Sequence, residues 1–88
     1  MNNNNNNTGK PNTVIIVNGR EKEWDEKEIS FKEVIVLAFG SYDNNSTTCY
    51  TVTYTRGNNP KPQGSLVEGE SINVKHKMIF NVSATDKS

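Results

Sequence analysis

Residues 13–24 read TVIIVNGREKEW, and this stretch decides the fold. A run of β-branched residues leads into Asn18-Gly19, the pair that best tolerates positive φ at both central positions of a type I′ turn. The stretch therefore predicts a hairpin with strands over 13–17 and 20–24. The second strand is charged on alternate positions, at Glu21 and Glu23, which is typical of a strand with one face in water.

The following segment, SFKEVIVLAFGS, predicts one helix of about ten residues. Ser30 and Glu33 have the spacing of a capping box, and Gly40 stands where a left-handed residue ends a helix. The β-branched residues 34–36 lower the intrinsic helix propensity, so packing against the rest of the protein must hold this helix. One stripe of the helix carries its apolar side chains, at Phe31, Val34, Leu37 and Ala38.

A third strand is indicated by CYTVTYTR at 49–56, where Tyr50, Val52 and Tyr54 alternate with threonines and share one face. The next stretch, GNNPKPQGS, holds two prolines and two glycines, and it predicts no regular structure until about Leu66.

The last two strands are expected in SINVK at 71–75 and MIFNVSA at 78–84, around a tight turn near His76 and Lys77. Phe80 and Val82 are expected to point into the core. The complete order of elements indicates an α+β protein with a mixed sheet of four to five strands and one packed helix.

The composition excludes several classes of function. Lys and Arg number 10 and Asp and Glu number 10 among 88 residues, so no net field attracts the chain to nucleic acid or to an anionic membrane. The single cysteine excludes an internal disulfide and fits a reducing compartment. No positively charged start precedes an apolar run of signal-peptide length. We therefore expect a soluble cytoplasmic protein that binds neither nucleic acid nor a membrane.

No pattern in the sequence has the spacing of a catalytic or metal site. His76 is interpreted as a solvated turn residue and Cys49 as an inert free thiol, because neither has a partner at ligand or triad spacing. Trp24 is interpreted as half-buried packing at the end of its strand, and the eight lysines as surface residues. We expect no enzymatic activity, no metal and no cofactor of its own.

The order of elements resembles the β-grasp fold of ubiquitin, in which the first and last strands lie side by side and parallel. The local residues resemble a bacterial family of ubiquitin-like proteins, the multiubiquitin domains. The likeness covers Val14 to Ser88 and rests on the segments VNGR, ISFKEVIVLA, YTVTY, GSLVEGESINVK and MIFNVSATDKS. It implies a β-grasp domain at 13–84 and a tail at 85–88. The asparagine-rich opening at 1–12 has no apolar surface to bury, so a disordered arm is expected there.

This resemblance implies a protein modifier and not a catalyst. The conjugation tail would be Thr85, Asp86, Lys87 and Ser88. An activating enzyme would adenylate the carboxylate of Ser88 with its own ATP and magnesium. A conjugating enzyme would pass the chain to target proteins, and a peptidase would remove it. The alternative is a noncovalent interaction module that binds through the β-grasp sheet and has an inert tail.

The tail departs from ubiquitin, which ends in Gly-Gly. Paired glycines thread a narrow channel because they have no Cβ atom and unrestricted φ and ψ, whereas serine lacks both properties. Three alternatives follow: partner enzymes with a wider channel that accepts Ser88, trimming of the tail before activation, or no conjugation. We favour the first. A sulfur carrier is a weaker interpretation, since those chains also end in Gly-Gly.

Overall fold

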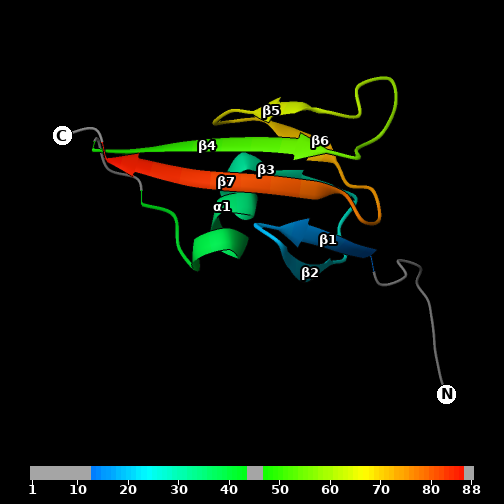
Figure 1. Ribbon diagram of the computed structural model, residues 1–88, viewed down its shortest axis with the longest axis horizontal. Helices are drawn as coiled ribbons and strands as arrows, with labels where there is room; N and C mark the ends of the chain where they lie inside the picture. Colours follow the sequence, from blue (N-terminus) through cyan, green and yellow to red (C-terminus); the bar gives the residue numbers. More distant parts are fainter. Residues whose placement is uncertain (1–12, 44–46, 87–88) are drawn as a thin grey trace, which may run out of the picture.

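The computed structural model describes residues 13–43 and 47–86 (Figure 1). The predicted arm at 1–12 lies outside these residues. Within them the chain forms, in order, β1 (Thr13–Val17), β2 (Arg20–Trp24), β3 (Glu28–Ser30), α1 (Phe31–Phe39), β4 (Thr48–Thr55), β5 (Gly64–Leu66), β6 (Ser71–Asn73) and β7 (Ile79–Asp86).

The main sheet has the strand order β2-β1-β7-β4-β5, so the last strand is central. β1 and β7 run parallel, with Ile16 opposite Ile79 and Val17 opposite Phe80, and the other neighbours pair antiparallel. The two expectations of a mixed α+β sheet and of parallel first and last strands are therefore confirmed. β3 and β6 form a separate two-stranded sheet.

The hairpin turn has the backbone that its sequence predicts. Asn18 has φ 52° and Gly19 has φ 81°, as a type I′ turn requires. The side chain of Asn18 also reaches across to the central strand, where its amide donates to Val82 O at 3.1 Å and its Oδ1 accepts from Val82 N at 2.8 Å. One turn residue thus extends the β1–β7 pairing by two side-chain hydrogen bonds.

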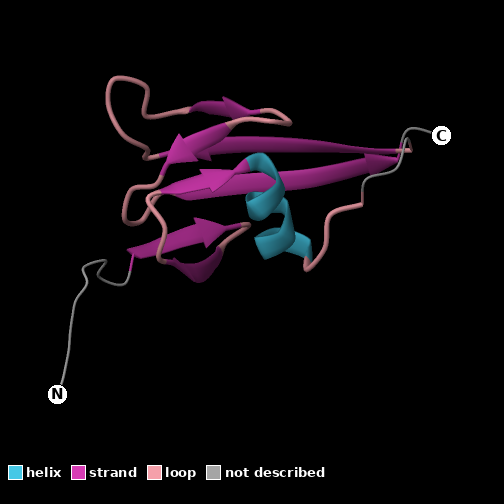
Figure 2. Ribbon diagram, turned by 180° about the vertical axis from the view of Figure 1, so that it is seen from behind, coloured by secondary structure: helices cyan, strands magenta, loops and turns pink. Residues whose placement is uncertain are grey.

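The helix begins and ends where the sequence predicts. Glu33 N donates to Ser30 Oγ at 3.1 Å and Ser30 N donates to Glu33 Oε1 at 2.9 Å, which completes the capping box. Gly40 has φ 86°, and its N–H donates to Val36 O at 2.7 Å. The helix lies across one face of the sheet (Figure 2). Its buried stripe includes Ile35, which the predicted stripe omits, while Leu37 and Ala38 are half-buried.

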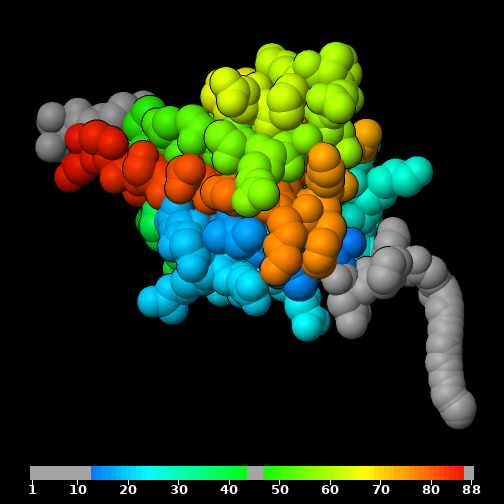
Figure 3. Space-filling view, turned by 45° about the vertical axis from the view of Figure 1, so that its right-hand side comes forward, coloured from blue at the N-terminus to red at the C-terminus, as the bar shows by residue number. Residues whose placement is uncertain are grey.

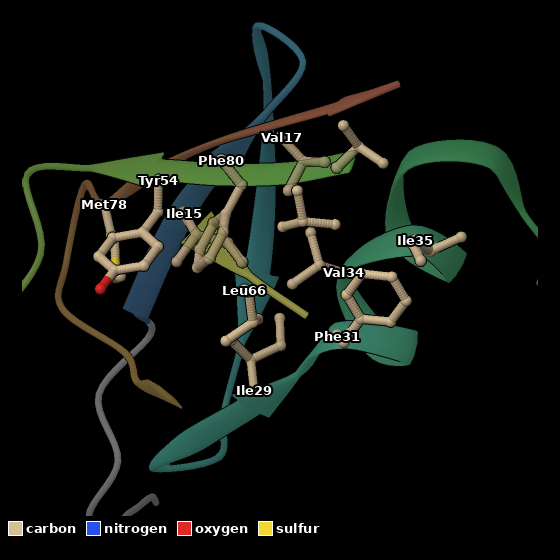
Figure 4. Packing of buried hydrophobic residues seen from close by; sticks show 12 residues of the cluster. Ile15, Val17, Ile29, Phe31, Val34, Ile35, Tyr54, Leu66, Met78 and Phe80 are labelled. Carbon is tan, nitrogen blue, oxygen red and sulfur yellow. The ribbon is translucent and has the colours of Figure 1, made fainter. Parts of the chain in front are cut away.

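One hydrophobic core lies between the helix and the main sheet (Figure 4). Phe80 and Val82 point into it, as predicted, and Phe80 has no exposed surface. The core residues come from all parts of the described chain: Ile15, Val17, Ile29, Phe31, Val34, Ile35, Val52, Tyr54, Leu66, Met78, Phe80 and Val82.

Three local predictions were wrong. Strand β3, directly before the helix, was not predicted, because three residues are too few for an alternation to register. β5 begins at Gly64, inside the stretch expected to be irregular. A Cβ there would lie 3.0 Å from Tyr54 Oη, a tight contact that glycine avoids where this strand approaches β4. β6 ends at Asn73 and pairs with β3 rather than with β7.

The turn between the last two strands is present near the predicted residues. Lys77 has φ 72°, and its N–H donates to Val14 O at 2.6 Å, while Met78 N donates to Lys75 O at 2.9 Å. This turn is therefore bound to the first strand, and it directs the chain into the centre of the sheet.

We predict that Gly19→Val destabilises the protein by about 1 to 2 kcal/mol, because a β-branched residue is strained at positive φ. A Cβ atom added at this position would meet no atom within 4 Å, so the cost is conformational and not a clash. Urea denaturation gives the free energy of unfolding. An unchanged midpoint would contradict the turn assignment.

We also predict that Asn18→Gly costs about 1 to 2 kcal/mol, because glycine keeps the positive φ but removes both hydrogen bonds to Val82. Asn81→Ser is the matched control. Asn81 is exposed in the same strand as Val82, and its loss should change the free energy of unfolding by less than about 0.5 kcal/mol. Equal losses for both variants would show that the Asn18 amide contributes nothing specific.

Candidate functional site

The predicted conjugation tail leads out of a two-stranded ribbon formed by the ends of β4 and β7. Eight residue pairs join these strands, from Thr55 opposite Ile79 to Thr48 opposite Asp86. β1 pairs with β7 only up to Phe80, and β5 pairs with β4 only from Val52 onward. Residues 83–86 and 48–51 therefore extend beyond both neighbours, and the space-filling view shows them projecting past the hairpin (Figure 3).

The last strand is longer than predicted. Thr85 pairs with Cys49 and Asp86 pairs with Thr48, so both belong to the sheet although they were assigned to the tail at 85–88. Pairing with β4 keeps both residues in the strand. Their small, exposed side chains show no apolar alternation, so the sequence gives no sign of this extension. Lys87 and Ser88 lie outside the described residues, and their role stays a prediction.

Aromatic side chains support the ribbon on the face that the helix covers. Tyr50 stacks on Tyr42, with ring centroids 5.4 Å apart, and it also contacts Phe39 at 6.2 Å. Its hydroxyl accepts from Asp43 N at 2.9 Å. A shallow groove of about 380 Å³ lies between these aromatic residues and the end of the ribbon. It is lined by Phe39, Ser41, Asp43, Thr47, Thr48, Tyr50, Ala84, Thr85 and Asp86.

Tyr42 connects this aromatic cluster to charged residues of two other segments. Its hydroxyl donates to Glu68 Oε2 at 3.4 Å, and Lys32 Nζ lies 5.7 Å from the centre of its ring. Partial burial and the negative charge of Glu68 raise the pKa of Tyr42 above its ordinary value. Sequence reasoning missed this cluster, because Phe39, Tyr42 and Glu68 share no periodic pattern and only the fold brings them together.

The remaining candidate residues have structural surroundings. His76 is exposed in its turn, as interpreted, and its Nδ1 accepts from Val14 N at 3.1 Å. Cys49 is exposed and free within β4. Trp24 is half-buried against the core and donates from Nε1 to Glu28 O at 2.9 Å, which confirms its interpretation as packing. Tyr54 is buried and shares its strand face with Tyr50.

The described residues also bear on two other kinds of site, for a metal ion and for a membrane. Over 13–43 and 47–86, no group of three or more histidine, cysteine, aspartate or glutamate side chains has a geometry that could hold a metal ion. In the same ranges, the helix is not long and apolar enough to cross a membrane. The features that remain are a projecting ribbon and the grooves beside it.

A mixed sheet with parallel first and last strands, crossed by one helix, defines a ubiquitin-like β-grasp protein. The family model described as Multiubiquitin matches residues 13–86, and the chain belongs to this family. Ubiquitin-like domains are typically non-enzymatic. No curated protein and no solved structure matches the chain.

We predict that Tyr42 ionises above the ordinary tyrosine pKa of 10.0 and that Glu68→Gln lowers its pKa. A tyrosine whose pKa is raised by folding adds stability below its unfolded pKa, and this stability is lost as pH rises through the folded pKa. NMR of the ring carbons of Tyr42 follows the titration directly. Glu26→Gln, which removes an exposed carboxylate elsewhere, is the control and should leave the pKa of Tyr42 unchanged. The same titration in all three proteins would contradict the contact between Tyr42 and Glu68.

Proposed function

We propose that this chain is a bacterial ubiquitin-like modifier that an activating enzyme adenylates at its terminal carboxylate and that is then conjugated to target proteins. The observation that carries the proposal is the course of β7 in a multiubiquitin domain. This strand is held at the centre of the sheet, yet its last residues extend beyond the neighbouring strands to the ribbon tip at Asp86. The body of the domain would dock the enzyme, and the residues after Asp86 would enter the nucleotide site.

The chemistry needs activation because a carboxylate is a poor electrophile. A carboxylate oxygen of Ser88 attacks the α-phosphorus of ATP, and pyrophosphate leaves to give an acyl adenylate. A nucleophile of the conjugating enzyme or the target then attacks the carbonyl carbon, and AMP leaves with the oxygen. The activating enzyme supplies ATP and magnesium, so the modifier needs no cofactor of its own.

The ribbon limits how the tail could reach that site. Two residues, Lys87 and Ser88, follow Asp86, and an extended chain of this length spans about 7 Å. The proposal of Ser88 as the reacting residue therefore requires that the ribbon tip comes within that distance of the nucleotide, or that the pairs of Thr85 and Asp86 with β4 open. In both cases the partner channel must accept a strand with side chains, since the paired glycines of ubiquitin are absent.

The second candidate is a noncovalent interaction module with an inert tail. The grooves beside β4 favour it, because they are shaped surfaces that require no reaction at the terminus. Both candidates need a partner that binds the surface of the domain, and they differ in whether a covalent adduct forms.

We predict that adding one residue after Ser88 stops adenylation, because it moves the carboxylate by about 3.3 Å and in-line attack on phosphorus tolerates much less. Amidation of the terminus should also stop it by removing the attacking carboxylate. The assay incubates each chain with ATP, magnesium and an activating enzyme encoded near its gene, and it measures pyrophosphate release and adducts by intact mass.

Circular dichroism of the native, extended and amidated chains is the control for folding, and the three spectra should agree. Equal turnover of the native and extended chains would contradict the role of Ser88 and favour trimming before activation. Absence of turnover by every form would favour the noncovalent module.

A further inference from the structure

A second groove, of about 400 Å³, lies on the opposite edge of β4 from β7. It is lined by five consecutive residues of β4, 48–52, and by four residues at the end of β5 and beyond it, 65–68. Phe31, Tyr42 and Asp43 complete its wall. A groove along consecutive strand residues borders the main chain itself, which distinguishes it from a pocket between side chains.

The main chain of β4 has an open edge in this groove. The side chain of Asn18 forms hydrogen bonds with the N–H and C=O of Val82, which therefore point toward β1. Val82 thus exchanges no main-chain hydrogen bonds with Val52, its partner in β4. The N–H and C=O of Val52 point the other way, toward β5. The direction of the main-chain N–H and C=O groups alternates along a strand. Those of Tyr50, two residues before Val52, therefore point to the same edge of β4. Within the described residues β5 ends at Leu66, opposite Val52, and Tyr50 has no strand partner there (Figure 1).

The helix-side wall of this groove is aromatic. Phe31 meets Tyr42 edge to face, with centroids 6.4 Å apart, and Tyr42 stacks on Tyr50. Val67, at the exit of β5, is 54% exposed. A side chain placed opposite Tyr50 would lie on the same sheet face as Tyr50, and it would therefore meet these rings.

The charges of the groove are acidic. Asp43 and Glu68 are the charged residues that line it. In the described part of the chain, no lysine or arginine forms an ion pair with either carboxylate; the ion pair found there joins Lys77 to Glu21. Lys32 does not line this groove; its Nζ lies over the ring of Tyr42, and it lines a neighbouring groove with Glu68 and Glu70.

We propose that this groove binds an extended, basic peptide segment of a partner protein, which adds as a strand to the open edge of β4. Main-chain hydrogen bonds to Tyr50 would give affinity, as in other cases of strand addition. A lysine or arginine opposite Tyr50 would lay its aliphatic stem on the rings of Phe31 and Tyr42 and direct its charge to Glu68 or Asp43. The proposal does not rest on conjugation, since the groove requires neither ATP nor a reactive terminus.

A second copy of this chain fits the groove less well. Symmetric pairing of two β4 edges would place Asp43 and Glu68 of one copy near the same residues of the other, and like charges across a strand pair are destabilising. Charge complementarity therefore favours a basic partner segment.

The test uses the peptide acetyl-Thr-Lys-Thr-Val-Thr-Val-amide, whose lysine and valines share one strand face. Antiparallel to β4 and with its lysine opposite Tyr50, it extends toward Thr48, because Leu66 already occupies the edge at Val52. It is titrated to about 1 mM into ¹⁵N-labelled protein without ATP or any enzyme, and amide shifts are followed by NMR. We expect the largest shifts at Tyr50, Leu66 and Val67. Replacing the lysine by glutamate, or methylating the lysine main-chain nitrogen, should weaken binding about tenfold, because the first reverses the charge and the second removes a ladder donor.

The protein variants separate charge from fold. Glu68→Gln should weaken binding of the lysine peptide about fivefold. Glu26→Gln, with the same loss of charge at an exposed residue that does not line the groove, should leave it unchanged. Equal binding of the lysine and glutamate peptides, shifts confined to other surfaces, or no shifts at the highest concentration would overturn the proposal. Self-association that grows with protein concentration and broadens Tyr50 without peptide would also overturn it, in favour of a second copy.

Discussion

The pairing of β7 between β1 and β4 is the constraint on which the rest of the structure depends. The hairpin and the helix are local, but neither can bury its apolar face until β7 is in place. Phe80 is fully buried at the centre of this strand, and Ile16 N, Asn18 N and the Asn18 amide all bond to β7 or to the residue before it. These contacts join residues more than 60 positions apart, so the core closes only after a long loop has been ordered.

β7 has two halves with different physical roles. Its first residues alternate between core and solvent, and Phe80 and Val82 anchor it in the sheet. Its last residues, Ser83 to Asp86, are exposed and pair only with β4 among the main-sheet strands described. The apolar half holds the strand in position, and the polar half can therefore project without weakening the core. The proposed modifier would use this division to present its end to an enzyme.

Tyr50 links the two surfaces proposed for partners. Its ring lines the groove along the open β4 edge and also the groove under the ribbon next to Thr85 and Asp86. Its stacking on Tyr42 connects both grooves to the carboxylate of Glu68. A segment bound at the β4 edge would therefore contact the same aromatic cluster that supports the ribbon. Recognition of a partner and presentation of the tail would thus share one set of side chains.

Local chemistry in the sequence determined the elements whose geometry depends on few residues. Asn18-Gly19 specifies the turn through positive φ, the Ser30 and Glu33 pair begins the helix, and Gly40 ends it. The class of fold followed from the order of these elements. The conjugation tail was located from resemblance, and its role is still a prediction.

Tertiary structure alone decided the features that depend on distant pairing. The three-residue strands β3, β5 and β6 exist because a partner strand supplies their hydrogen bonds, and no alternation so short is visible in a sequence. The same reason extends β7 to Asp86, since β4 holds residues whose own side chains show no strand pattern. β5 ends at Leu66, whereas β4 continues to Thr48. This difference leaves the edge beside Tyr50 open, and Glu68, just past the end of β5, contacts Tyr42 there. Such a place is defined by registers between segments, which no single segment encodes.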